Sequence, residues 1–600
     1  MKTVKVEQTH LAKLAAADPH KRFRRLYRRI CDPDWLNAAL DAIRANKGFN
    51  TPGTDGVKGD DLDQAQIDRL AAQLRQGTYH PTPVRRVFIP KRNGKLRPLG
   101  LPSAADKVVQ SALKLLLEPI YETAFRDCAH GFRPARSCHT ALKAHLLSHT
   151  STWTLEGDLE SFFDRIDHGI LLTLLRKRIA DERLIELIRQ FLKAGYLQDW
   201  QWHATYSGSP QGGVLSPLLS NIYLLDFDRY VEEDLGANQP RETGHAAKNP
   251  AYNRINLRVN RLSHRIAREP DAERRAALLG TLQQLQEQRK RTPSMKPTRH
   301  LSYQRYADDW ILGLHGYSKA EARALKEQIA GWLTGHLKLT LSPEKTLITH
   351  WTKRVKFLGF ESRGIRSRSN GANWMPRLLI SHEAEQRVTH TVAKLTRQTP
   401  IAPEDMILAV NQVLRGWMNY YCYATNPHRV FARVLHHAFW CLVRYLNKRH
   451  KRRGARKALR QYYRRVRGKQ TLAVTSPVTQ HQVSLIRSIG RKSLFDLKTT
   501  TPEANVWKRP WMVYSAAVGR SPWQRAEVRR IQQDLCLQCG NPLEEVHHRR
   551  ALKRRTDPVG AGYAARKVGL CHDCHAVRTQ QQRKQGRQGK PDAGRLACPV

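Results

Sequence analysis

The chain has 600 residues, which is more than one hydrophobic core usually organises, so several domains are expected. Its 103 Lys and Arg against 52 Asp and Glu leave a formal charge of +51, and a chain this basic is expected to bind a polyanion, with nucleic acid as the first candidate. No apolar run has the length of a signal peptide or a membrane span, so the sequence argues against a secreted or membrane protein.

The first half of the chain contains recognisable local patterns. The first thirty residues are basic and partly helical in pattern. Residues 84–101 alternate around an Asn93-Gly94 turn, which predicts a β-hairpin, and Ser103 is a candidate N-cap for the helix after it. A strand over 153–158 ends in Asp158. A Gly-Pro loop then enters a helix with Ser216 and Pro217 as its cap and first turn.

The second half begins with a charged segment, residues 253–292, that reads as helical. LSYQRYADDWILGLHG at 301–316 predicts strand, tight turn, strand, and from residue 360 to about 450 the pattern is mostly helical. Residues 444–469 hold thirteen Lys and Arg and no acid. The last twenty residues, rich in Gln, Arg and Gly, are expected to be disordered.

Two adjacent carboxylates, Asp308 and Asp309, lie in an otherwise apolar run. Like charges at the edge of a core are costly, so a cation is expected beside them. Together with Asp158 they could hold the two Mg²⁺ ions that polymerases use for in-line attack on a nucleotide. An isolated acid pair in a turn is ordinary, however, so the surrounding motifs must decide.

The order of those motifs resembles the group II intron reverse transcriptases, also called maturases. The similar blocks are TPGTDGV (51–57), IPKRNGKLRPLGLPSAADKVVQ (89–110), AFRDCAHGFRPARSCHTAL (124–142), GDLESFFDRIDH (157–168), SPQGGVLSPLLSNIYL (209–224), RYADDWILG (305–313), LTLSPEKT (339–346) and VKFLGF (355–360). Blocks in the family's order are far more specific than any single motif.

The resemblance implies roles for individual residues. Asp158 and Asp308 would bridge the two Mg²⁺ ions, with Asp309 more peripheral, because consecutive residues of an extended chain point to opposite faces. The dNTP would be held by five further residues: Lys91, Arg97, Phe163, Gln211 and Lys345.

Within that group, Lys91 and Arg97 would contact the triphosphate, Phe163 would lie under the sugar and exclude a 2′-hydroxyl, and the loop of Gln211 would approach the templating base pair. Lys345 would lie near the pyrophosphate, where it could act as a general acid. On the residues alone, Phe163 is equally a core aromatic, and the three cations are equally solvated surface groups.

A second set of residues is expected to grip nucleic acid. NQVLRGWMNYYCYAT (411–425) resembles the family's helical thumb, which implies binding of the folded intron RNA. We expect its aromatic residues to pack and Arg415 to contact phosphate. The basic run then fits a DNA-binding segment, in which cations follow phosphates and tyrosines stack on bases. Its candidates are Arg452, Arg453, Tyr462, Tyr463 and Arg464; the alternative is an exposed basic helix with no single partner.

Two CxxC pairs near the carboxyl end predict a structural Zn²⁺ site of Cys536, Cys539, Cys571 and Cys574. The EVHH and CHDCH segments resemble an HNH endonuclease. That comparison implies Glu545, His547 and His575 as ligands of a third, catalytic divalent ion and His548 as the general base. The family's middle Asn is absent, which keeps open a non-cleaving module whose histidines only complete the zinc ribbon.

The resemblance therefore implies an α+β multidomain chain, a group II intron-encoded protein with a right-hand polymerase. The expected divisions are fingers and palm with a basic extension at 1–365, α-helical thumb (maturase) at 366–450, basic DNA-binding segment at 451–525, small zinc-braced HNH (ββα-metal) domain at 526–580, and tail at 581–600.

The implied function is retrohoming. The protein would assist splicing of its intron RNA, remain in the ribonucleoprotein, nick double-stranded target DNA and copy the intron from that primer with dNTPs. A bacterial-type cytoplasmic location with nucleoid association during integration and no membrane partner is expected. The rivals are a splicing maturase with idle catalytic sites and a reverse transcriptase of another type, which would lack the long thumb and HNH module.

Overall fold

The structure is a computed structural model. It describes residues 2–46, 48–90, 96–147, 152–198, 201–203, 208, 212–239, 249–292, 299–366, 374–398, 400–450, 454–466, 468–475, 482–494, 545–548 and 567–570.

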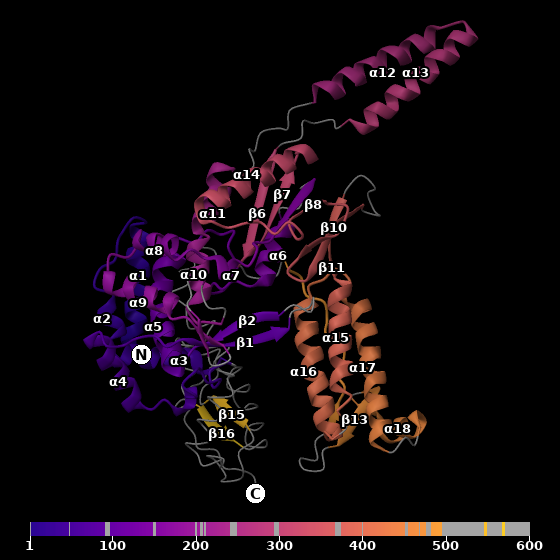
Figure 1. Ribbon diagram of the computed structural model, residues 1–600. Helices are drawn as coiled ribbons and strands as arrows, with labels where there is room; N and C mark the ends of the chain where they lie inside the picture. Colours follow the sequence, from indigo (N-terminus) through magenta and orange to yellow (C-terminus); the bar gives the residue numbers. More distant parts are fainter. Residues whose placement is uncertain are drawn as a thin grey trace, which may run out of the picture.

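A helical cluster forms around one long buried helix, α5, in the amino-terminal part of the chain (Figure 1). Ser103 caps α5 as predicted, because its side chain accepts a hydrogen bond from the Asp106 N–H. The indole of Trp35 donates to the Ala112 carbonyl, which fixes α3 against α5. The helices of the cluster are α1 (Lys2–Ala17), α2 (Tyr27–Ile30), α3 (Pro33–Arg44), α4 (Gln64–Gln76) and α5 (Ala104–Glu122), with a 3-10 turn at Gly59–Asp61.

The predicted β-hairpin is confirmed and forms part of a small sheet. Strand β1 (Val84–Pro90) pairs antiparallel with β2 (Leu96–Leu101), and the sheet continues through β4 (Tyr196–Gln198) to β5 (Gln201–His203). In Figure 1 the β1–β2 pair reaches from the helical cluster toward the helices drawn in orange. The β1–β2 pair therefore projects as an arm from the amino-terminal helical cluster (Figure 1).

The central sheet carries the predicted acids. Its strand order is β6-β7-β3-β8, and all pairs are antiparallel. Strand β3 therefore lies between β7 and β8, which come much later in the chain. Its strands are β3 (Trp153–Gly157), β6 (His300–Tyr306), β7 (Asp309–His315) and β8 (Leu347–His350). The strand, turn, strand prediction at 301–316 is thus confirmed.

Helices surround this sheet and join it to the amino-terminal cluster in one hydrophobic core. The second predicted N-cap is off by one residue: Leu215 holds the cap position of α10, and Ser216 is its first residue. These helices are α6 (Cys138–Leu147), α7 (Phe162–Arg165), α8 (His168–Arg176), α9 (Glu182–Lys193), α10 (Ser216–Tyr223), α11 (Leu225–Arg229), a π-helical turn at Tyr230–Asp234, and α14 (Lys319–Leu337).

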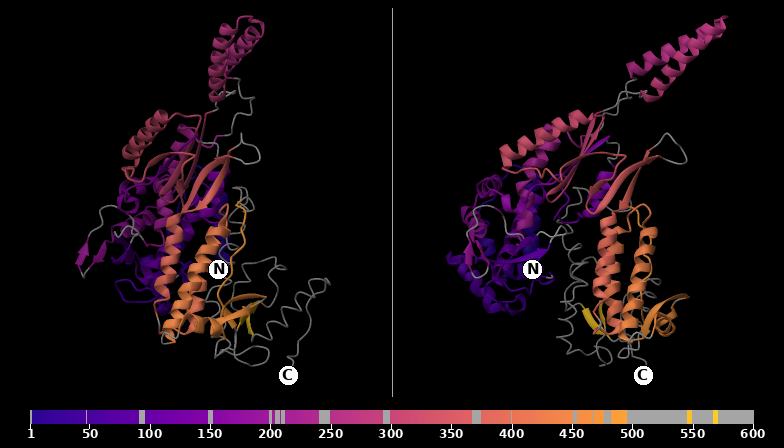
Figure 2. Two further views of the ribbon diagram at one scale, coloured as in Figure 1. Left: turned by 90° about the vertical axis from the view of Figure 1, so that its right-hand side faces the viewer. Right: turned by 45° about the vertical axis from the view of Figure 1, so that its right-hand side comes forward.

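A helical hairpin is inserted before β6, as the charged segment predicted. It consists of α12 (Pro250–Arg268) and α13 (Ala272–Arg291), which pack side by side and project from the rest of the molecule in every view (Figures 1 and 2).

A second unit follows the central sheet and is built on a second hydrophobic core, which also includes Ile311 of β7 and residues of α6. It begins with the sheet β11-β10-β9 and continues with three long helices that stand beside the β1–β2 arm in Figure 1. Its elements are β9 (Val355–Phe357), β10 (Phe360–Arg366), β11 (Trp374–Ile380), α15 (His382–Leu395), α16 (Pro403–Tyr421), α17 (Pro427–Arg449), α18 (Ala455–Tyr462), β12 (Tyr463–Val466), β13 (Lys469–Thr475) and β14 (Gln482–Ser484).

The structure differs from the expected pattern at the start and at the end of this unit. The mostly helical pattern expected from residue 360 is strand up to Ile380, and the helices begin only at His382. The unit also does not end at 450, because Leu472, Leu485 and Leu494 are buried in the same core as the helices. Burial of these residues, rather than the basic composition around them, sets the boundary.

Near the carboxyl end, β15 (Glu545–His548) pairs antiparallel with β16 (Lys567–Leu570). No helix in the described ranges is both long and apolar enough to cross a membrane.

Candidate active site

The turn between β6 and β7 presents the predicted acid pair. Tyr306 pairs with Asp309, so Ala307 and Asp308 form a two-residue turn. Ala307 has a φ of 58°, the left-handed conformation that such turns require. Gly131 lies directly beneath, where any Cβ would collide with the backbone nitrogen of Ala307. Asp308 is therefore held at the tip of a tight turn with a closely fitted support.

A buried arginine locks this turn from below. The Arg305 and Asp228 side chains are fully buried and form a two-bonded ion pair, with Nε to Oδ1 at 2.7 Å and Nη2 to Oδ2 at 2.6 Å. Arg305 also donates to the Ala307 carbonyl at 2.9 Å and to the Asn221 side chain at 3.0 Å. Burial alone would lower the pKa of Arg305, but Asp228 outweighs it and raises that pKa. The backbone of Ala307, the residue before Asp308, is thus hydrogen-bonded to a buried ion pair.

We expect Asp228→Asn to destabilise the protein by about 3–5 kcal/mol, because it leaves the Arg305 charge buried without its partner. Unfolding in urea, followed by tryptophan fluorescence, measures the loss. The matched control is Asp226→Asn, two residues away, whose ion pairs with Lys177 and Arg229 lie at the partly exposed surface and should contribute about 1 kcal/mol or less each. Equal losses of stability in the two variants would contradict a special stabilising role for the buried Arg305–Asp228 pair.

Asp158 reaches the same place from the neighbouring strand. Gly157 pairs with Trp310, and a Cβ at Gly157 would collide with the Trp310 indole, so only glycine lets the two strands approach here. This register sets Asp158, the next residue, beside the start of β7. The Lys345 Nζ lies 2.8 Å from Asp158 Oδ2, which places the SPEKT segment at the edge of the cluster.

Electrostatics confirm that the acids influence one another. Burial and then repulsion by Asp158 raise the pKa of Asp308, while Arg97 and Lys345 oppose the shift. The side chain of Asp309 reaches solvent, yet displacement of water by the surrounding protein, followed by repulsion from Asp308 and Asp158, raises its pKa to about 7. Hydrogen bonding to Asp158 raises the pKa of Lys345. The structure therefore brings Asp158, Asp308, Asp309, Arg97 and Lys345 together.

This donor set fits a divalent cation. Hard oxygen ligands on separate strands are what Mg²⁺ prefers, and the raised pKa values show that the site favours added positive charge. Within the described residues, no three His, Cys, Asp or Glu side chains are already gathered as a metal cluster, and Asp158 is instead paired with Lys345.

The remaining dNTP residues are only partly described. Phe163 is half-buried, with its ring edge-on to Phe162 at 5.2 Å between centroids. Lys91 and Gln211 lie outside the described residues. Next to Gln211, Gly212 has a φ of 114°, and a Cβ there would lie 2.6 Å from the Gly100 carbonyl oxygen of β2. The glycine therefore permits close approach to the β1–β2 arm.

Among the predicted nucleic-acid contacts, one residue needs correction. Tyr462 is buried in the second core and its hydroxyl bonds to His450 at 2.7 Å, so its ring is not available to stack on a base. Tyr463 is 40% exposed, and Arg415 and Arg464 are exposed. Arg452 and Arg453 lie outside the described residues.

The aromatic residues of the 411–425 block pack, as predicted. The Trp417 indole donates to the Ala384 carbonyl, and the Tyr420 hydroxyl donates to the Leu358 carbonyl. Tyr421 is buried.

The predicted zinc ligands Cys536, Cys539, Cys571 and Cys574 and the predicted HNH ligand His575 lie outside the described residues. Glu545, His547 and His548 lie on β15, for which the strand pairing is described.

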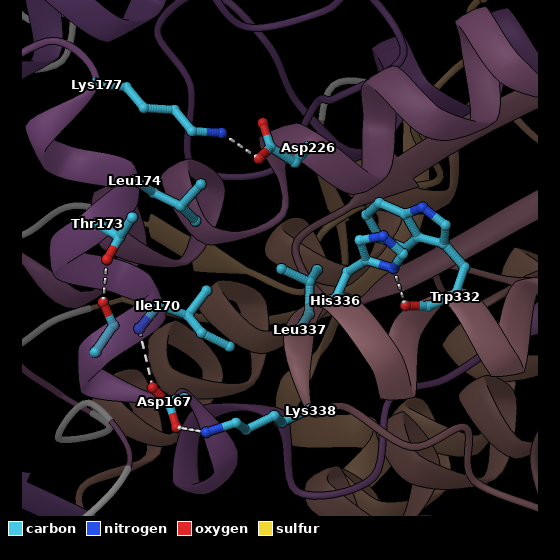
Figure 3. Close-up of a pocket in the computed structure, with 11 residues that line it drawn as sticks. Asp167, Ile170, Thr173, Leu174, Lys177, Asp226, Trp332, His336, Leu337 and Lys338 are labelled. Atoms are coloured by element: carbon cyan, nitrogen blue, oxygen red, sulfur yellow. Dashed lines mark hydrogen bonds and ion pairs between the residues drawn. The ribbon is translucent and has the colours of Figure 1, made fainter.

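A pocket of about 440 Å³ lies apart from the acid cluster, between α8, α11 and α14. Figure 3 shows two ion pairs on its lining, Lys177 with Asp226 and Lys338 with Asp167, each at 2.7 Å, and the parallel rings of Trp332 and His336. Its two acids are each paired with a lysine, whereas Asp308 and Asp309 of the turn repel each other. The better candidate for a metal site is therefore the β6–β7 turn and not this pocket.

Sequence reasoning missed the supports of the site, chiefly Arg305, Asp228 and Gly131. One signal was available: Leu301, Tyr303 and Arg305 alternate on one face of a strand, so Arg305 had to point inward and find a buried acid. Nothing in the sequence identifies that acid as Asp228.

Two family models match the chain. Residues 89–242 match the reverse transcriptase (RNA-dependent DNA polymerase) model, and residues 385–463 match the maturase-specific domain of group II introns. The first match contains Asp158 and ends before the inserted hairpin.

Three relatives extend these matches. The group II intron-encoded protein LtrA of Lactococcus lactis is 39% identical over 433 residues, 67% of this chain and 71% of LtrA. YkfC of Escherichia coli is 38% identical over 398 residues, 65% of this chain and 94% of YkfC. The COX1/OXI3 intron 2 protein of Saccharomyces cerevisiae is 25% identical over 590 residues, 92% of this chain and 65% of that protein.

The matched polymerase domain defines a reverse transcriptase, and this class of enzyme implies the use of Mg²⁺. The maturase-specific domain implies binding of group II intron RNA. The chain belongs to the family of group II intron-encoded reverse transcriptase/maturases.

Proposed function

We propose that this protein performs the whole retrohoming cycle: it assists splicing of its intron RNA, nicks target DNA through a carboxyl-terminal HNH module, and copies the intron from the new 3′-hydroxyl. The observation that supports the polymerase part is the strand register that sets Asp158 beside Asp308 and Asp309 at a closely supported turn.

In this proposal Asp158 and Asp308 would hold the Mg²⁺ ions, with Asp309 as the more peripheral acid. Bound ions would activate the 3′-hydroxyl and neutralise the leaving pyrophosphate. Lys345 neutralises Asp158 in the free protein. Once that contact is exchanged, its ammonium lies at the edge of the site, where it can hold or protonate the pyrophosphate.

The other dNTP contacts follow from the arm and the loop that meet beside the acids. Arg97 is on β2, near enough to lower the pKa of Asp308, so its guanidinium can reach a triphosphate lying over the cluster. We assign Lys91 to the same triphosphate, Gln211 to the templating base pair and Phe163 to the sugar.

In right-hand terms, we assign the amino-terminal cluster and β1–β2 arm to the fingers, the central sheet to the palm, and the α15–α17 helices to the thumb. The thumb and maturase unit then extends from 355 to 494 instead of ending at 450. Its exposed cations, with Arg415 and Arg464 as representatives, would follow RNA or DNA phosphates, and Tyr463 offers a ring for stacking.

The HNH assignment gains support from strand pairing. Antiparallel pairing sets Glu545 opposite Leu570 and His548 opposite Lys567, and such a strand pair is the ββ part of a ββα-metal fold. In that fold Glu545, His547 and His575 would hold one divalent ion, His548 would act as general base, and the four cysteines would bind structural Zn²⁺.

One reaction tests the complete proposal. The protein is incubated with its intron RNA, dNTPs and target DNA labelled at the 5′ end of the strand to be nicked. We expect spliced RNA, a shortened labelled strand, and then a longer labelled strand in which cDNA is joined to that nick. Splicing and incorporation on a supplied primer without any nick would instead identify a reverse transcriptase with a non-cleaving module.

A further inference from the structure

The α12–α13 hairpin is an insertion in the polymerase domain whose two ends lie close together. The chain leaves at Asn238, whose N–H donates to the Leu301 carbonyl at 2.8 Å, and whose side chain accepts from the Tyr303 N–H and donates to the Tyr303 carbonyl. Asn238 has a φ of 60°, a left-handed conformation that asparagine tolerates. The two ends of the insertion are therefore fastened together on β6, and the hairpin adds to the palm without interrupting it.

One face of α12 carries a continuous row of arginines. Successive members are separated by four, three, four and three residues, the spacing that keeps side chains on one side of a helix. All are exposed, and they span about 21 Å at 1.5 Å per residue. The row, called the arginine ladder below, consists of Arg254, Arg258, Arg261, Arg265 and Arg268.

The ladder is not needed to hold the hairpin together. Another face of α12 repeats apolar residues at the same spacing, Ile255, Val259, Leu262 and Ile266, and Val259 is buried. Across the hairpin, Arg289 of α13 donates to the Asn256 side chain. No ladder arginine forms an ion pair with any acid of the described residues; an ion pair on this hairpin joins Arg274 to Asp271. The positive charge of the row can therefore bind an anionic partner.

We infer that the arginine ladder is a docking surface for the phosphate backbone of double-stranded segments of the intron RNA. A forked guanidinium binds phosphate oxygens in pairs, and a straight row of five can follow a regular backbone. The inference adds an RNA contact remote from the active site to the RNA binding that the maturase domain implies, and it does not depend on the proposed DNA cleavage.

The composition of the hairpin favours a duplex over single-stranded RNA. Proteins that grip single strands use aromatic rings as stacking platforms. In residues 249–292 the aromatic residues are Tyr252 and His264, and Tyr252 is half-buried at the base of α12. A face of arginines alone recognises backbone and shape, which is how helical RNA is bound.

The test compares two triple variants of the full-length protein. The first, Arg258→Gln/Arg261→Gln/Arg265→Gln, removes the middle of the ladder. The second, Arg274→Gln/Arg275→Gln/Lys290→Gln, removes the same charge from the same hairpin, but from exposed positions of α13 that do not form a row. Circular dichroism checks that both keep the helix content of the wild type.

Binding is measured for the folded intron RNA and for an RNA duplex, a DNA duplex and a single-stranded RNA, each of about 20 base pairs or nucleotides so that it exceeds the length of the ladder. We expect the ladder variant to bind the intron RNA and the RNA duplex about 10- to 100-fold more weakly, and the slope of log K against log salt to fall by about 2 to 3. The control variant should lose less than about threefold.

Three outcomes would overturn the inference: wild-type affinity in the ladder variant, equal losses in both variants, or a larger ladder-dependent loss on the DNA duplex or the single strand than on the RNA duplex. Incorporation of dNTPs on a short unstructured RNA template with a supplied primer should be the same for all three proteins. This measurement distinguishes failure of the RNA-docking inference from failure of the proposed polymerase function.

Discussion

Replacing Asp308 with alanine is expected to lower dNTP incorporation on a primed RNA template by at least about 1,000-fold, which corresponds to about 4 kcal/mol of activation free energy. Asp308 lies at the tip of the β6–β7 turn, where its carboxylate is forced close to Asp158. Without it, a bridging oxygen ligand for both proposed ions is lost. Splicing of the intron RNA by the same variant should stay near wild type, because the maturase helices pack in the second hydrophobic core, to which Asp308 does not belong.

The matched control is Glu327→Ala, which removes an exposed acid of α14. It should leave incorporation unchanged, so a fall in activity cannot be assigned to net charge. Primer extension retained by Asp308→Ala would contradict the metal assignment. A parallel loss of splicing would indicate instead that the variant is misfolded, which the unfolding midpoint measures independently.

His548→Ala is the second change with a large expected effect. If His548 deprotonates the attacking water, cleavage of the target strand should fall by about 100- to 10,000-fold, the usual contribution of a general base. Incorporation on a supplied primer should not change, because the polymerase acids belong to another part of the chain. The measurement is nicking of end-labelled target DNA by the protein assembled with its intron RNA.

Two controls make this result specific. His390→Ala alters an exposed histidine of α15 and should cleave normally. The zinc content of His548→Ala should equal that of the wild type, which shows that the module is still folded. Unchanged nicking by His548→Ala would reject the general-base role, and absence of nicking in the wild type would identify a degenerate module.

Much of the catalytic part of the fold could be predicted from local sequence. The two-strand pattern around Asp308 and the cap at Ser103 depend on residues a few positions apart, and both are observed. The charged segment before β6 was recognised as helical for the same reason. Local periodicity and cap chemistry are visible without knowing the tertiary structure.

The supports of the site depend on contacts that sequence does not reveal. Arg305 and Asp228 are 77 residues apart in the chain, and only the packed sheet brings them together. The local pattern does not reveal β10 and β11, because these strands are defined by their pairing with each other, and strand preference depends on such tertiary contacts. Tyr462 was assigned to nucleic acid from its basic neighbours, whereas its ring completes a core.

The most direct test of the central claim is to count the divalent ions held by the turn. Mn²⁺ is titrated into the protein bound to an RNA template, a chain-terminated DNA primer and the next dNTP, and followed by electron paramagnetic resonance. The wild type is predicted to hold a magnetically coupled pair of ions, and Asp158→Ala/Asp308→Ala is predicted to lose it. A coupled pair that persists in the double variant would contradict the assignment of this acid cluster as the polymerase centre.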